Sequence, residues 1–283
     1  MSCGINIDRR VQRAGGLRWH YREAGQGGGL PLVLLHPSPR SSAMYEPWMA
    51  ALAAQGRVLA IDTPGYGGSD PLPAEPAHLG DYVAPLRDLL HTVAGPRVLL
   101  YGSATGAQLG IAYALRHPQD VAHLLLDSAA HFDDEECSLL LARYFPDLTP
   151  QPDGSHLQAM WQMATQMLQF FPWFLADEAH RISSRVPSAA EVHAAALELL
   201  TAGPGYASAY RAAFAHERAA HVQALRVQTT VFRWQASILL KHIDRLLSFA
   251  LPANVQVLNT PADMAARYAA MGAHVQALRQ TLT

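Results

Sequence analysis

The segment Val98–Ala107 constrains the fold of this chain most, because an apolar run leads into a turn of small residues and then into a helical pattern. Val98–Tyr101 has the composition of a buried strand. Gly102 and Gly106 would let the backbone pack closely at a strained turn. The segment therefore predicts a sharp strand-to-helix turn, whose central residue, Ala104, carries only a methyl group.

Short apolar runs alternate with helical patterns along much of the chain. The predicted strands are Leu17–Ala24, Leu32–Leu35, Arg57–Ile61, Val98–Tyr101, Val121–Asp127, Thr229–Arg233 and Asn254–Leu258. Wholly apolar strands between helices are typical of a parallel sheet that is covered on both faces. We therefore predict an α/β fold, in which the alternating segment Leu17–Ala24 forms a half-exposed edge strand.

The strand pattern stops between residues 131 and 222. Apolar, aromatic and alanine-rich helical segments occupy this stretch, and six prolines interrupt it: Pro146, Pro150, Pro152, Pro172, Pro187 and Pro204. We therefore predict a core formed by residues 1–130 and 223–283, with a helical insertion at residues 131–222.

Three segments resemble motifs of the α/β-hydrolase superfamily, in the same order and at the same spacing. They are His36–Pro39, Asp62–Asp70 and Gly102–Ala107, and each follows an apolar strand. The last resembles a nucleophile elbow with the degenerate form Gly-Ser-Ala-Thr-Gly. The resemblance implies an α/β-hydrolase fold, with a mostly parallel central sheet flanked by helices and an inserted helical cap.

The resemblance also implies a Ser-His-Asp triad, and all three of its positions are altered here. Ala104 stands at the position of the nucleophile. The segment that should carry the acid, Trp234–Ile238, has no carboxylate, and the segment that should carry the base, Asn259–Met264, has no histidine. His274 lies too late in the chain, so we expect a packing or surface role for it. A serine-hydrolase mechanism is therefore not expected.

The resemblance places the two amides of an oxyanion hole at Ser38 and Thr105. Backbone N–H groups at the start of a helix would still hold a carbonyl or anionic oxygen, because they depend on no lost side chain. The other residues predicted at the pocket are His36, Ser103, Asp127 and Trp161.

Acid–base chemistry would need a titratable side chain near this pocket. His131 and His156 are the predicted catalytic groups, since imidazole titrates near neutral pH. Three of these residues have an alternative interpretation. His156 would then belong to a helix-capping region, and Asp127 would have a helix-capping or loop role through Ser128. Ser103 would be a packed or strand-end hydroxyl.

Two functions stay open. One is an enzyme that acts without a covalent nucleophile on a small, mostly apolar ester- or carbonyl-containing metabolite. The other is a pseudohydrolase that binds such a ligand but does not transform it. Non-hydrolytic proteins with altered elbows are known in the superfamily, so the resemblance itself does not decide between the two.

Composition limits the partners, the cofactors and the cellular location that we expect for this protein. Half of the 283 residues are hydrophobic and the formal net charge is −2, so no nucleic-acid or membrane partner is expected. The 14 histidines show no metal-ligand spacing, and neither a metal nor a cofactor is expected. With only Cys3 and Cys137 and no leader-like apolar run, we predict a cytoplasmic protein with a small-molecule ligand. A homodimer stays open.

Overall fold

A computed structural model of the chain describes residues 6–27 and 29–282. Cys3 and the first residues of the N-terminus, on which part of the cytoplasmic prediction rests, lie outside the described residues. Cys137 is a buried free thiol. Among the described residues, no helix combines the length and the apolar character that crossing a bilayer requires.

Eight strands form one sheet in the order β1-β2-β4-β3-β5-β6-β7-β8. Their bounds are β1 Asp8–Ala14, β2 Leu17–Ala24, β3 Leu32–Leu35, β4 Val58–Ile61, β5 Val98–Ser103, β6 Val121–Asp127, β7 Thr229–Trp234 and β8 Val255–Thr260. In the order β4-β3-β5-β6-β7-β8 each strand is parallel to the next, whereas β2 is antiparallel to both β4 and β1. The predicted mostly parallel sheet is confirmed.

The edge of the sheet differs from the prediction. β2 is not an edge strand, because it lies between β4 and β1, with Asp8 opposite Glu23 and Ala14 opposite Leu17. β1 is rich in arginine and mostly exposed, so its sequence lacks the hydrophobic alternation that marks a half-buried strand. Charged side chains suit an edge strand, where they hinder pairing with another chain.

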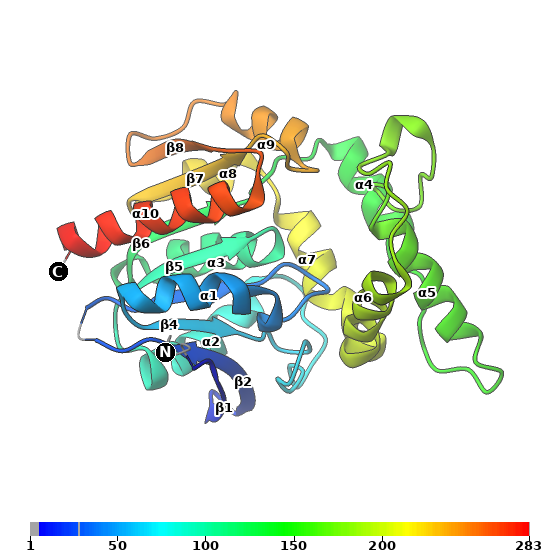
Figure 1. Cartoon of the computed structure of the whole chain (residues 1–283), viewed down its shortest axis with the longest axis horizontal. Coiled ribbons are helices and arrows are strands. Elements are labelled where there is room, and N and C mark those ends of the chain that lie inside the picture. Colours follow the sequence, from blue (N-terminus) through cyan, green and yellow to red (C-terminus); the bar gives the residue numbers. More distant parts are fainter. Residues whose placement is uncertain (1–5, 28, 283) are drawn as a thin grey trace, which may run out of the picture.

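Helices cover both faces of this sheet (Figure 1). Their bounds are α1 Glu46–Leu52, α2 Gly80–Val93, α3 Thr105–Arg116, α4 Asp134–Arg143, α5 Ser155–Met167, α6 Ala189–Ala202, α7 Ser208–His216, α8 Ala219–Gln223, α9 Leu240–Leu247 and α10 Met264–Leu282. β3 shows why the central strands are wholly apolar. Val33 and Leu35 pack with α2 and α3 on one face, whereas Leu32 and Leu34 pack with α1 and α10 on the other.

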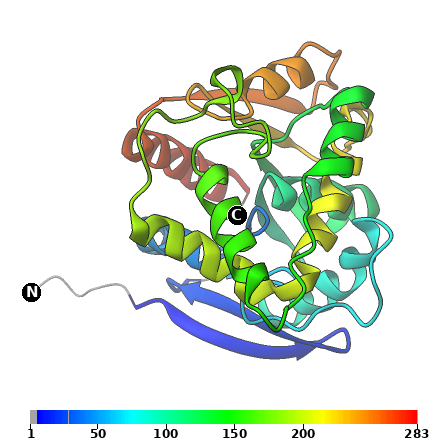
Figure 2. The same ribbon diagram turned by 90° about the vertical axis from the view of Figure 1, so that its right-hand side faces the viewer.

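Helices α4 to α8 follow one another between β6 and β7. The ribbons of α4, α5 and α6 lie beyond one end of the sheet in Figure 1, and Figure 2 turns this side toward the viewer. Their apolar side chains form a cluster of their own with α7 and α9. Because α7 and α8 also pack against α3, the exact boundary between a cap and the core stays a prediction.

Two imidazoles meet on one threonine between the sheet and α10. Nε2 of His123 lies 2.8 Å from Oγ1 of Thr230, and Nε2 of His274 lies 2.9 Å from the same oxygen. Burial, with a smaller contribution from His274, lowers the pKa of His123 to about 4. His274 therefore lies in a packing network on the sheet.

We expect acid to destabilise the protein through His123. Because its pKa is lowered in the folded state, the unfolded chain binds a proton between about pH 6.5 and the folded pKa, and the folded chain does not. The stability that the neutral imidazole provides above this range should be lost as pH falls, at roughly 1.4 kcal/mol per pH unit. Urea unfolding between pH 7 and 4 measures how the free energy of unfolding depends on pH, and His123→Gln should reduce this dependence by the equivalent of one proton. An unchanged pH dependence would show that His123 is not its source.

Candidate functional site: a strained turn beneath an aromatic cavity

The turn between β5 and α3 has the strained backbone that its sequence predicts. Ala104 has φ of 46° and ψ of −112°, a conformation that side-chain-bearing residues rarely adopt. A Cβ atom on Gly102 would lie 2.1 Å from the carbonyl oxygen of Gly106, and one on Gly106 would lie 2.1 Å from that of Leu35. Both glycines are therefore required by close backbone contacts.

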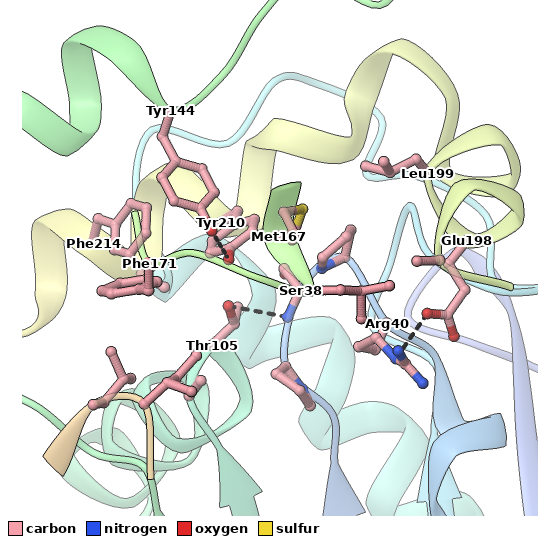
Figure 3. Close-up of a pocket in the computed structure, with 18 of the residues that line it drawn as sticks. Ser38, Arg40, Thr105, Tyr144, Met167, Phe171, Glu198, Leu199, Tyr210 and Phe214 are labelled. Carbon is pink, nitrogen blue, oxygen red and sulfur yellow. Dashed lines mark hydrogen bonds and ion pairs between the residues drawn. The ribbon is translucent and has the colours of Figure 1, made fainter. Parts of the chain in front are cut away.

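A cavity of about 240 Å³ lies above this turn. Its floor includes Ser38, Ala104 and Thr105. Four aromatic side chains, which we call the cavity rings, contribute to its wall: Tyr144, Phe171, Tyr210 and Phe214. Figure 3 shows the phenol groups of Tyr144 and Tyr210 directed toward each other, with their hydroxyl oxygens 2.9 Å apart. The cavity is therefore mainly apolar, with a few polar groups at fixed positions.

The two predicted oxyanion-hole residues meet at this floor. The Ser38 N–H donates a 3.3 Å hydrogen bond to Oγ1 of Thr105 (Figure 3). Thr105 is the first residue of α3, where a backbone N–H has no acceptor within the helix. Both residues line the cavity, but the oxyanion role itself stays a prediction.

His36 lies beside the cavity and does not line it. Its Nδ1–H donates to the carbonyl oxygen of Pro37 at 3.0 Å, and its Nε2 accepts from the N–H of Thr63 at 2.9 Å. These two bonds require the neutral tautomer with the proton on Nδ1. Burial lowers the pKa of His36, so it joins the loops after β3 and β4 as a neutral group.

Asp62 also joins the loops that follow β3 and β4. Its carboxylate accepts hydrogen bonds from the N–H groups of Ser42 at 2.7 Å and Gly68 at 2.9 Å, and it lies 2.7 Å from Nδ1 of His20. Burial opposes ionisation, yet these partners hold the pKa of Asp62 below its usual value. The aspartate of the second motif therefore anchors loops.

The remaining predicted pocket residues lie outside the cavity. Ser103 is the last residue of β5, and Trp161 is 44% exposed on α5. Asp127 is buried, where it accepts a 2.6 Å hydrogen bond from the Tyr101 hydroxyl and forms an ion pair with Arg267. Asp127 therefore belongs to a buried charge network behind the turn.

The two predicted catalytic histidines also lie away from the cavity lining. Nδ1 of His131 accepts from the N–H of Ala219 at 3.0 Å, and its ring packs against Phe249. Nδ1 of His156, in the first turn of α5, accepts from the N–H of Gln151 at 2.9 Å. Neither position supports a direct acid–base role.

A family model described as "alpha/beta hydrolase fold" matches residues 31–199, which is more than half of the chain. The chain belongs to the α/β-hydrolase fold family. The order of the strands and the strained turn after β5 agree with this assignment.

Two curated relatives of this α/β-hydrolase are similar over part of their length. Epoxide hydrolase 3 from Xenopus tropicalis is 31% identical over 121 residues, covering 41% of this chain and 32% of that protein. A haloalkane dehalogenase from Mycobacterium marinum is 33% identical over 116 residues, covering 39% of this chain and 38% of that protein. The matches thus span well under two thirds of either relative.

Solved structures extend the likeness over nearly the whole chain. Epoxide hydrolase A from Mycobacterium thermoresistibile superposes with a TM-score of 0.71 at 19% identity, covering 97% of this chain and 98% of that one. At this identity the likeness shows the fold.

Two carboxyl groups of the cavity wall were missed by the sequence analysis. Glu198 on α6 pairs with Nε of Arg40 at 2.8 Å (Figure 3). Glu217, which follows α7, is 2% exposed, and burial raises its pKa well above the usual value. Neither belongs to a motif; the only signal for Glu217 was a charged residue after the alanine-rich run 212–215.

The described residues contain no cluster of histidine, cysteine and carboxylate side chains that could hold a metal ion. The polar groups at this site are therefore backbone amides, the hydroxyl groups of Ser38 and Thr105, two phenols, two carboxyl groups and the Arg40 guanidinium that pairs with one of them. They can bind a ligand, polarise an oxygen and exchange protons.

Proposed function

We propose that this α/β-hydrolase binds a small, mostly apolar ester- or carbonyl-containing molecule in its cavity, with the carbonyl oxygen held by the N–H groups of Ser38 and Thr105. The strained turn at Ala104 carries this proposal, because it brings a helix start and a neighbouring loop amide to one apolar cavity. Amides fixed in this way stabilise charge that develops on an oxygen.

A reaction in this cavity would be noncovalent at the position of Ala104, since a methyl group cannot attack a carbonyl. The polarised carbonyl would instead react with a second molecule or rearrange, with protons exchanged by the phenols or by Glu217. Burial raises the pKa of Tyr144 to about 12, so its hydroxyl stays a hydrogen-bond donor at neutral pH.

A ligand-binding protein without turnover is the second candidate. Two observations favour this candidate. Ala104 offers only a methyl group, and the Ser38 N–H, one of the two amides proposed to hold the ligand oxygen, already donates a hydrogen bond to Thr105. In that case the capped cavity would bind the same class of ligand and release it unchanged.

A ligand screen tests the proposal and separates the two candidates. Aromatic and short-chain esters and ketones should raise the melting temperature, by an amount equivalent to about 2.7 kcal/mol at a hundredfold excess over Kd. Mass spectrometry after prolonged incubation then shows whether each ligand is transformed. Ala195→Phe, which fills the cavity from α6, should abolish the effect, whereas Ala194→Phe on the exposed side of α6 should not. Equal responses of the two variants would contradict the assigned cavity.

Ala104→Ser should not create a serine hydrolase. A serine hydroxyl becomes a strong nucleophile only beside a general base, and no histidine is among the described residues that line the cavity. We expect no labelling of the variant by a fluorophosphonate probe and no ester turnover above that of the unmodified protein. Rapid labelling would show that a base reaches this position.

We also propose a cytoplasmic location and no nucleic-acid or membrane partner, on the basis of the net charge of −2 and the two cysteines. Cell fractionation tests the location. Size-exclusion chromatography with light scattering distinguishes a monomer from a homodimer.

A further inference from the structure

The Glu217 carboxyl group has no partner among the described residues. No described group forms a hydrogen bond or an ion pair with it, and its Oε2 is fully buried. The neighbouring Arg218 is turned elsewhere, since its guanidinium donates to the carbonyl oxygens of Phe132 and Glu217. Glu198, the other carboxyl group of the cavity, is paired with Arg40. Glu217 is thus the carboxyl group of this lining that lacks a countercharge.

The cavity rings surround this space without a cation over their faces among the described residues. A fifth aromatic side chain of the lining, Phe170, does carry an arginine, since Arg181 lies 4.8 Å from its ring centroid. Two neighbouring rings are covered in the same way: Arg211 lies 4.4 Å from the centroid of Phe145, and Arg143 lies 4.6 Å from that of Phe174. Aromatic faces attract cations through their quadrupole, most strongly where water is excluded. The cavity rings therefore have cation-binding capacity that the chain itself does not use.

Glu217 also stands at the carboxyl end of α7. The last carbonyl groups of a helix make this end partly negative and favour a positive charge nearby. In the absence of such a charge, burial makes the ionised carboxylate costly and raises the pKa of Glu217. A positive group in the cavity would offset that cost and interact with the rings at the same time.

We propose that the cavity binds a small organic cation, with an amine or quaternary ammonium group held between the Glu217 carboxyl group and the cavity rings. This inference deepens the proposed function and rests on it, because it names the ligand class of the same cavity. The preferred ligand would be an ester or carbonyl compound that also carries an ammonium group.

Two probes of nearly equal shape test the charge directly. The cation is meta-hydroxyphenyl-trimethylammonium, and its neutral counterpart is meta-tert-butylphenol, in which a carbon atom replaces the charged nitrogen. By isothermal titration calorimetry on the full chain, we expect the cation to bind about tenfold more tightly than the neutral probe. In Glu217→Gln, which keeps the shape of the side chain, this preference should disappear.

Control variants separate the ion pair from changes in net charge or folding. Glu135→Gln removes an exposed acidic residue of α4 and should keep the tenfold preference. Tyr210→Leu keeps the Glu217 carboxyl group but removes one ring, and it should weaken binding of the cation more than binding of the neutral probe. Circular dichroism of each variant confirms that it is folded.

The remaining outcomes overturn the inference. Equal or tighter binding of the neutral probe by the unmodified chain would exclude the cation as ligand class, while the proposed carbonyl-binding function would stand. A preference that survives in Glu217→Gln would exclude Glu217 as its source. If neither probe binds, the inference fails, and the separate screen of esters and ketones decides whether the proposed function fails as well.

Discussion

Gly106→Ala is expected to destabilise the protein by about 4 kcal/mol or more, enough to unfold many domains. The added Cβ would lie 2.1 Å from the carbonyl oxygen of Leu35 and 2.9 Å from that of His36. Both atoms belong to the main chain where β3 ends, so no side-chain rotation can relieve the overlap. Helix α3 would have to move away from the sheet, and the turn at Ala104 would move with it.

Urea unfolding followed by circular dichroism measures this effect. Gly205→Ala is the matched control, because no described atom beyond the adjoining backbone and chain neighbours lies within 4 Å of the position that a Cβ would take there, and the φ of Gly205 is not in the left-handed region. We expect the control to change stability by less than about 1 kcal/mol. A cooperative Gly106→Ala protein of unchanged stability would show that α3 does not pack as closely on β3 as described.

Arg267→Met is expected to cost roughly 3–5 kcal/mol, because it leaves the buried Asp127 carboxylate without its countercharge. Both side chains are about nine-tenths buried or more. The guanidinium also lies 4.4 Å from the ring centroid of Trp234, and this contact would be lost as well. The effect is large for one residue because, among the described residues, the desolvated charge that remains keeps only two neutral hydroxyl groups as partners, those of Tyr101 and Ser128.

A double-mutant cycle tests the origin of this cost. Asp127→Asn combined with Arg267→Met should be less destabilised than the sum of the single variants, since no unpaired charge stays behind. Arg10→Met removes a half-exposed guanidinium that pairs with Asp8 and Glu23 on the two outer strands, and it should cost less than about 1 kcal/mol. Strict additivity of the two buried substitutions would contradict the ion-pair explanation.

The core could be predicted from the sequence because its signals are local. The strand Leu32–Leu35 is apolar throughout since both of its faces are buried. Glycines at positions 102 and 106 indicate that backbone segments pack closely at this turn. β1 was missed because an exposed edge strand needs no hydrophobic face; its three arginines lie at the rim of the sheet.

The lining of the cavity was less accessible to such reasoning. Ser38, Ala104 and Thr105 were found because each belongs to a motif beside a strand end. His131 and His156 were chosen for their chemistry, but their positions depend on how distant helices pack. Glu217 reaches the cavity only because α7 folds back onto α3, and no local pattern encodes that contact.

The hydrogen bonds of His36 and Asp62 have a consequence for how family signatures should be interpreted. Both side chains lie in recognisable motifs, yet their partners are the N–H groups of Thr63, Ser42 and Gly68. A substitution there would disturb loop anchoring whether or not the protein breaks any bond in a substrate. Selection for a correctly folded chain is thus sufficient to maintain these signatures, and a protein can lose the reaction of its relatives without any visible decay in them.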